Sequence, residues 1–196
     1  MTLIELAKEA IENYIQDRKI IFPPESLSKE FFEKKSGTFV TIEKNGELRG
    51  CIGTYLPTRK NIAEEVIHNA IAAAIEDYRF GPIQKEELPY LSYAVYILSQ
   101  PELVKDIKKE LNPKKFGIIV KTAPIAYSDT DVVFNGHFVA KAGLLLPDLK
   151  GVDTIEQQIL IACKKGGIDP KREKILIYKF TVEKYKWKNK KSPLIF

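Results

Sequence analysis

Apolar side chains recur at helical spacing in two long segments of the chain. The first follows Thr2 and Glu5, which match the capping-box pattern, and predicts an amphipathic helix over residues 3–17. The second begins near Asn61 and covers residues 60–77, with small and β-branched residues spread around most of its surface. Because this apolar stripe is wide, we expect the second helix to be mostly buried.

A β-hairpin is the clearest local prediction. Two β-rich runs, 38–44 and 47–53, flank Asn45-Gly46, the preferred pair for a two-residue type I′ turn. Such a turn fixes the register, so Lys44 is expected to face Glu47, Ile42 to face Arg49, and Val40 to face Cys51. Alternation along the strand then places Arg49 and Cys51 on one face, beside Val40 and Ile42.

Further elements follow without a regular β-α-β alternation. Strands are predicted over residues 90–98, 116–121, 138–146 and 174–186, and a helix over 154–165 that ends at Gly166. Residues 123–135 mix short strand signals with turn residues and are ambiguous. This order favours an α+β fold with a mixed or antiparallel sheet and flanking helices.

Composition places the chain among ordinary globular proteins. Its 196 residues are 44% hydrophobic and 29% charged. No apolar run approaches the roughly 18–20 residues needed to cross a bilayer. The first residues lack the basic start and apolar core of a signal peptide, so we expect a cytoplasmic protein with no membrane segment.

Positive charge collects near the end of the chain. The net charge is +5, and Lys184, Lys186, Lys188, Lys190 and Lys191 alternate with Tyr185 and Trp187. Basic residues interleaved with aromatic ones can bind single-stranded nucleic acid. A solvated chain end is the simpler interpretation, and both remain open.

The chemically versatile residues are few. The chain has two cysteines, Cys51 and Cys163, which we expect to be free thiols, and two histidines, His68 and His137. This set excludes a multi-histidine metal site, and no metal is predicted, while a site assembled in space from cysteine, histidine and aspartate stays open. No glycine-rich phosphate loop is present either, so the sequence leaves any cofactor unknown.

The segment from Glu47 to Thr54 carries the strongest chemical signal. Only five of the 31 basic residues are arginines, and one of them, Arg49, lies two residues before Cys51. A guanidinium near a thiol favours the reactive thiolate. One interpretation is therefore a nucleophilic or ligand-contacting Cys51 beside an anion-holding Arg49. The other is a small buried cysteine with Arg49 in a structural ion pair.

Three more residue types complete the candidate site. Gly50 and Gly53 lack side chains, so a ligand or another backbone can come close. Asp77-Tyr78-Arg79 ends the second helix, and Arg79 can either join Arg49 in binding a carboxylate or phosphate, or pair with Asp77. The candidate binding residues are therefore Arg49, Gly50, Gly53, Asp77 and Arg79, with Cys51 as the candidate catalytic residue.

These residues also carry a family resemblance. Leu48-Arg49-Gly50-Cys51-Ile52-Gly53 resembles the signature of the AMMECR domain family, and other matching segments occur in the family's order over nearly the whole chain. They include Phe39-Val40-Thr41, Asp77-Tyr78-Arg79-Phe80, Leu98-Ser99-Gln100-Pro101-Glu102 and Leu144-Leu145-Leu146-Pro147. The chain departs from the family pattern in three places. Asp148 stands where family members often have glutamine, and Val152-Asp153 stands near the position of a frequent Trp-Asp pair. Residues 123–135 look like a longer insert than is usual.

The resemblance implies one AMMECR-type domain in two unequal subdomains. We expect the larger to comprise approximately residues 1–20 and 36–190, and the smaller residues 21–35 with part of 55–90. It also implies an association with Memo-like and radical S-adenosylmethionine (radical SAM) proteins, but it brings no established reaction. Three functions stay open: a small-molecule or modifying site at the signature, a non-catalytic module that docks such a partner, and nucleic-acid binding by the basic tail. Whether the protein is an enzyme is left undecided.

Overall fold

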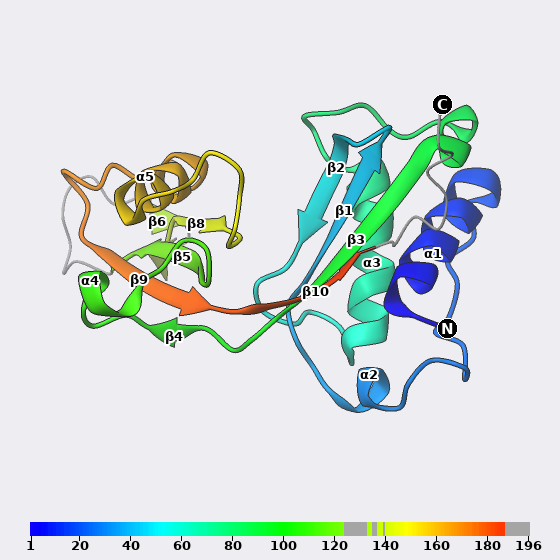
Figure 1. Ribbon diagram of the computed structural model, residues 1–196, viewed down its shortest axis with the longest axis horizontal. Coiled ribbons are helices and arrows are strands. Elements are labelled where there is room, and N and C mark those ends of the chain that lie inside the picture. Colours follow the sequence, from blue (N-terminus) through cyan, green and yellow to red (C-terminus); the bar gives the residue numbers. More distant parts are fainter. Residues whose placement is uncertain (124–132, 135–136, 139, 187–196) are drawn as a thin grey trace, which may run out of the picture. The chain divides into compact units, whose positions relative to one another are not determined.

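The structure, a computed structural model, describes residues 1–123, 133–134, 137–138 and 140–186 (Figure 1). The chain divides into two compact units, one made of Met1–Leu98 with Glu183–Phe196 and the other of Ser99–Val182. These boundaries differ from the expected ones, because residues 21–35 and 55–90 belong to the first unit rather than forming a small subdomain. No helix in the described segments is both long and apolar enough to cross a membrane.

Two long helices organise unit 1. Helix α1 spans Leu3–Asp17, where Thr2 and Glu5 form the expected capping box and Arg18 ends the helix in a left-handed conformation with φ of 57°. Helix α3 spans Ile62–Ile75 and begins where Asn61 accepts a hydrogen bond from the Glu64 N–H. As its wide apolar stripe predicts, α3 is buried along most of its surface. The short helix α2 (Glu30–Glu33) and the 3₁₀ helix η1 (Lys85–Tyr90) complete the set.

The sheet of unit 1 has four strands in the order β10-β3-β1-β2, with β2 at an edge (Figure 1). Strand β1 (Thr38–Lys44) pairs antiparallel with β2 (Glu47–Gly53) and with β3 (Leu91–Leu98). The fourth strand is β10 (Val182–Lys186). The buried face carries Val40, Ile42, Tyr93 and Val95, which join α1 and α3 in one hydrophobic core. The hairpin prediction is confirmed in both strands and in its Asn45-Gly46 turn.

The predicted hairpin register is correct for one pair and then wrong. Lys44 pairs with Glu47, but a β-bulge next to Glu43 leaves Arg49 as an extra residue on β2. Beyond the bulge Ile42 faces Gly50, Thr41 faces Cys51 and Val40 faces Ile52. Cys51 therefore shares its face with Thr41 rather than with Val40 and Ile42, which lie on the side that packs against the helices.

Unit 2 is built on a second antiparallel sheet in the order β4-β9-β5-β8. Its strands are β4 (Glu102–Leu103), β9 (Ile175–Phe180), β5 (Gly117–Thr122) and β8 (Ala142–Leu145). Helix α5 (Ile155–Lys165) packs on this sheet, and α4 (Ile107–Glu110) and a separate pair, β6 (Val133–Phe134) and β7 (His137–Phe138), complete the described elements. Cys163 lies in the core of this unit, where burial raises the pKa of its thiol.

Two strand predictions are corrected in extent. The run 174–186 is two strands, β9 and β10, which belong to different sheets because pairing breaks at Thr181. The run 138–146 contains the end of β7 and then β8. Most of the ambiguous interval 123–135 lies outside the described residues, apart from Ala123 and β6. The α+β class is confirmed, with helices beside antiparallel sheets in both units.

Gly50 is required by close packing between β2 and α3. A Cβ atom on Gly50 would overlap the carbonyl oxygen of Ala73 on the helix. Unit 2 contains an equivalent contact, since a Cβ on Gly143 of β8 would overlap the carbonyl of Ala162 on α5. In each unit a strand glycine therefore lets a helix approach the sheet more closely than any side chain would allow.

We expect Gly50→Ala to lower the free energy of unfolding by about 3 kcal/mol, because the strand or the helix must move to admit the methyl group. Urea unfolding followed by circular dichroism measures the change. Gly81→Ala is the matched control, since nothing lies within 4 Å of a Cβ built at Gly81. If the two variants were equally stable, the close contact between β2 and α3 would not restrict position 50 to glycine.

Candidate functional site

Cys51 sits at the free edge of the unit 1 sheet, and side chains replace the missing neighbouring strand there. The Cys51 N–H donates to Oδ2 of Asp77 at 2.8 Å, and the Cys51 carbonyl accepts from Nη2 of Arg79 at 3.3 Å. Both backbone groups of an edge residue are thus satisfied by one loop, the segment that follows α3. We call this arrangement of Cys51, Asp77 and Arg79 the edge clasp.

Within the edge clasp, Asp77 and Arg79 form a bidentate ion pair. Nε and Nη2 of Arg79 donate to Oδ1 and Oδ2 of Asp77 at 2.9 and 2.7 Å. The Asp77 side chain is 5% exposed, and its hydrogen bonds from Arg79 lower the pKa of its carboxyl to about 2. The pKa of Arg79 is raised, chiefly by the same hydrogen bond and further by the negative charge of the Asp77 carboxylate.

The Cys51 thiol faces Thr41 across the β1–β2 pair. Sγ of Cys51 lies 3.2 Å from the Thr41 hydroxyl, a hydrogen bond in which either atom can be the donor. Cys51 is a free cysteine and is partly exposed, in contrast to the buried Cys163. The residue is thus partly exposed while its thiol is hydrogen-bonded to Thr41, and a partly exposed position is one at which a cysteine can react.

Arg49, the extra residue of the β-bulge, is held by a different carboxylate. Its Nε and Nη2 donate to Glu87 at 2.9 and 2.8 Å, and its Nη1 donates to the Gly81 carbonyl at 2.9 Å. Lys44 also donates to Glu87 at 2.9 Å. Hydrogen bonds from Arg49 lower the pKa of Glu87 to about 2. Arg49 therefore ties β2 to η1 and to the end of the loop that carries the edge clasp.

The predicted site residues separate into two groups. The structure brings together Cys51, Asp77 and Arg79, whereas Arg49 engages Glu87, an acidic residue whose position the sequence left undetermined. The two glycines serve packing: Gly50 lies against α3, and a Cβ on Gly53 would overlap Phe39 and the Thr38 carbonyl. The sequence allowed either a ligand or another part of the backbone to come close to these glycines, and at both of them the structure places other atoms of the chain there.

Sequence reasoning missed a buried polar cluster on α3, beneath the end of β2. Glu65 is fully buried and accepts hydrogen bonds from the Thr54 and Thr58 hydroxyls and from the backbone N–H groups of Thr58 and Arg59, at 2.6 to 2.9 Å. One turn further, Asn69 donates to the carbonyl and hydroxyl of Thr38. The available signal was that Glu65 and Asn69, four positions apart, share one face of a helix whose other residues are mostly apolar.

Other chemically interesting residues lie apart from the edge clasp or outside the described residues. His68 accepts from Arg59 on an exposed side of α3, and the side chain of His137 is not described. Of the basic tail, Lys184 lies over the Tyr96 ring and Lys186 pairs with Glu43, while residues 187–191 lie outside the described part. Within that part, no three histidine, cysteine or acidic side chains gather closely enough to hold a metal ion.

Comparison with known proteins gives a consistent result. The AMMECR1 family model matches residues 4–185. A Thermotoga maritima protein is 47% identical over 184 residues, which cover 93% of this chain and 96% of that protein. Protein TK0174 of Thermococcus kodakarensis is 34% identical over 98% of this chain and 92% of its own length. The crystal structure of the uncharacterised protein PH0010 from Pyrococcus horikoshii superposes with a TM-score of 0.77 at 32% identity, over 93% of this chain and 88% of that chain.

We expect the edge clasp to make the protein more stable at neutral than at acid pH. The pKa of Asp77 is lower in the folded chain than in the unfolded one, so its contribution is present above about pH 4 and is lost as the pH falls towards 2. Asp77→Asn should therefore cost about 2 kcal/mol at pH 7. The difference from the unsubstituted protein should narrow as the pH is lowered to 3, which urea unfolding at several pH values will show.

Asp169→Asn is the matched control for that experiment, since Asp169 pairs with Arg172 on the surface, where their side chains are 49% and 87% exposed. It should change the free energy of unfolding by less than about 0.5 kcal/mol at any pH. A loss for Asp77→Asn that stayed constant between pH 7 and 3 would contradict an ionised clasp.

Proposed function

The chain belongs to the AMMECR1 family, and we propose that it acts on a small molecule through a site centred on the Cys51 thiol. The observation that carries the proposal is that Cys51 is a partly exposed free cysteine whose own N–H and carbonyl are both held by the Asp77–Arg79 pair. A thiol on a backbone held in this way keeps its position when a ligand approaches, as a nucleophile or ligand contact requires.

In this proposal each residue of the edge clasp has a separate role. Cys51 is the nucleophile or direct ligand contact, and the Thr41 hydroxyl can donate to its thiolate at the observed 3.2 Å. Arg79 supplies the positive charge that favours the thiolate. Its Nη1 makes no hydrogen bond to the described residues, which leaves a donor for an anionic group of the ligand. Asp77 is the positioning residue that orients Arg79.

Arg49 and Glu87 support the site from outside. Because Arg49 donates to the Gly81 carbonyl, the loop from Asp77 to Gly81 is attached to β2 at both of its ends. Nη1 and Nη2 of Arg49 each carry two N–H groups, and each donates one hydrogen bond to Gly81 or Glu87. The second N–H of each can still donate to an anion, so the anion-holding role expected for Arg49 remains part of the proposal. Its ion pair with Glu87 implies that it cannot be removed without also disturbing the fold.

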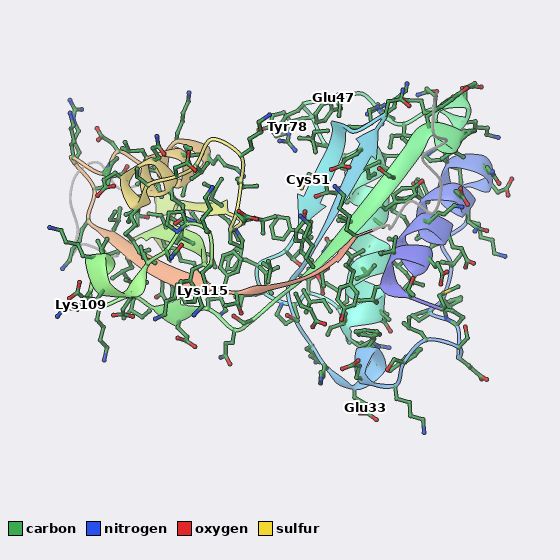
Figure 2. The ribbon with its side chains drawn as sticks, in the orientation of Figure 1. Glu33, Glu47, Cys51, Tyr78, Lys109 and Lys115 are labelled. Atoms are coloured by element: carbon green, nitrogen blue, oxygen red, sulfur yellow. The ribbon has the colours of Figure 1, made fainter. Side chains whose placement is uncertain are left out.

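A second candidate function is a non-catalytic module that docks another protein. It is favoured by apolar side chains left open on the two segments that meet at Cys51: Tyr78 is 95% exposed, and Leu48 is 44% exposed (Figure 2). Exposed aromatic residues are frequent anchors in protein interfaces. A Memo-like or radical SAM protein is the partner class that this candidate function would take.

Thiol labelling tests the cysteine-centred site. We expect iodoacetamide to modify Cys51 in the native protein and to leave the buried Cys163 unmodified, with both labelled after denaturation. Arg79→Gln should move the pH midpoint of Cys51 labelling upward, by about one unit, because the neighbouring cation is lost. Mass spectrometry of the labelled chain gives the rate at each pH.

Arg79→Lys is the matched variant, since it keeps the charge but loses the planar fork. If charge stabilises the thiolate, the labelling midpoint of Arg79→Lys should stay near that of the unsubstituted protein. A native Cys51 that does not react, or a midpoint equal to that of a free cysteine, about 8.5, in all three proteins, would reject the reactive thiol.

Co-purification tests the docking module. A Memo-like or radical SAM protein expressed together with this chain should be retained in a stoichiometric complex that survives Cys51→Ala but is weakened at least tenfold by Tyr78→Ser. Tyr90→Ser is the control, because Tyr90 is also exposed, at 60%, but is not part of the segments that meet at Cys51. Equal retention by both tyrosine variants, or no complex, would remove this candidate.

A further inference from the structure

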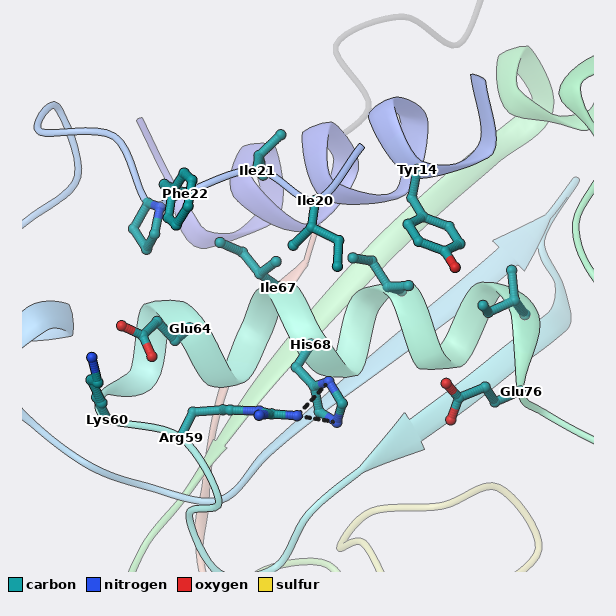
Figure 3. Close-up of a pocket in the computed structure, with 13 residues that line it drawn as sticks. Tyr14, Ile20, Ile21, Phe22, Arg59, Lys60, Glu64, Ile67, His68 and Glu76 are labelled. Atoms are coloured by element: carbon teal, nitrogen blue, oxygen red, sulfur yellow. Dashed lines mark hydrogen bonds between the residues drawn. The ribbon is translucent and has the colours of Figure 1, made fainter. Parts of the chain in front are cut away.

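Unit 1 contains a second concave site, and none of the residues that line it belongs to the edge clasp. A pocket of about 530 Å³ lies between α3 and the segment that continues from α1 through Pro23 (Figure 3). This volume falls within the range of about 300–1,000 Å³ that is usual for pockets that bind small molecules.

One wall of the pocket is apolar. Ile67, Ile71 and Ile75 recur every four residues along α3 and line the pocket. Ile20 and Phe22 lie across from Ile67 (Figure 3). Ile20 is 62% exposed and Phe22 is 90% exposed, so the folded chain leaves these large side chains open to water. Ile67 and Ile71 are themselves buried, so the apolar surface that an occupant would cover comes mainly from Ile20 and Phe22, and it favours an occupant with an apolar body.

The polar side of the pocket carries a positive charge that has no carboxylate partner. Arg49, Arg79 and Arg172 each bind a carboxylate, but the only described partner of Arg59 in the pocket is the imidazole of His68, at 3.0 Å from Nη2 to Nδ1. Lys60 adds a second positive charge at this end and Glu64 one negative charge, while Glu76 lies at the other end of the pocket (Figure 3). Among the side chains that line this end of the pocket, two are basic and one is acidic, and the carboxyl group of Glu65 lies buried beneath them.

The backbone of Arg59 is held in place by the protein itself. Its backbone N–H donates to Oε2 of the fully buried Glu65 at 2.7 Å, and the Thr58 N–H donates to the same atom at 2.7 Å. The buried polar cluster thus anchors the turn from which the guanidinium extends. A cation on an anchored turn loses less conformational freedom when it binds an anion than one on a free loop.

We propose that this pocket binds an amphipathic organic anion, with a hydrocarbon chain or ring along the three isoleucines of α3 and a carboxylate on Arg59. The carboxylate accepts from the guanidinium donors that His68 leaves unused. The apolar body covers Ile20 and Phe22, the two exposed apolar side chains of the lining. This site is separate from Cys51, so it stands or fails independently of the proposed function.

Competition between probe molecules tests the proposal in the full-length chain. We expect the fluorescent anion 1-anilinonaphthalene-8-sulfonate to bind, and decanoate to displace it at a concentration at least about tenfold lower than decan-1-ol, which has the same chain without the charge. Arg59→Gln should bring the two competitors within about twofold of each other, whereas Arg172→Gln, which removes the same charge in unit 2, should leave the preference unchanged.

Two further measurements locate the bound molecule. Phe22→Ala, a substitution at an exposed position that should not disturb folding, is expected to weaken decanoate and decan-1-ol alike by at least threefold. Because the chain has two histidines, proton resonances of the imidazoles can be assigned readily, and decanoate should shift the His68 signals and leave those of His137 unchanged. Equal potency of the two competitors in the unsubstituted protein, a preference that survives Arg59→Gln, or an unshifted His68 would each overturn the proposal.

Discussion

The carboxylate of Asp77, placed against the edge of β2, is the interaction on which the candidate site depends. An edge strand exposes unpaired N–H and C=O groups, and at Cys51 both are satisfied by the Asp77–Arg79 pair instead of by another strand. The contact of Asp77 with Cys51 also fixes the start of the loop after α3, and Arg49 fixes the far end of that loop through the Gly81 carbonyl. One carboxylate thus closes the sheet edge, orients Arg79 and fixes the backbone of the cysteine.

Helix α3 links this site to the rest of unit 1. Its Ala73 carbonyl lies against Gly50, one residue before Cys51, and its Glu65 and Asn69 hold the end of the hairpin where β1 begins and β2 ends. A buried carboxylate that accepts four hydrogen bonds is favourable only as long as all four donors stay in place. The signature strand and the pocket beside Arg59 therefore share one helix, which packs against the strand and supports the turn that carries Arg59.

The arginines of this chain serve structure and candidate chemistry together. In a lysine-rich protein, the planar fork of arginine appears where two parallel hydrogen bonds to a carboxylate are formed, at Arg49 with Glu87 and at Arg79 with Asp77. The loss of such an arginine removes two hydrogen bonds from a carboxylate that is largely buried, so activity and stability would change together. Conservative variants that keep either the charge or the shape are needed to separate the two effects at this site.

Local physical chemistry in the sequence determined much of the fold. Capping residues and apolar periodicity placed α1 and α3, and Asn45-Gly46 placed the hairpin, because each of these signals acts over a few neighbouring residues. The sequence also singled out Cys51, Asp77 and Arg79, since a cysteine between glycines and scarce arginines are visible without a structure. Only the tertiary structure decided what these residues touch. The β-bulge at Arg49 places Cys51 opposite Thr41, Arg49 forms an ion pair with Glu87, and Arg59 donates to His68. These contacts could not be predicted, because the register of a strand and the pairing of distant side chains depend on the packing of whole elements.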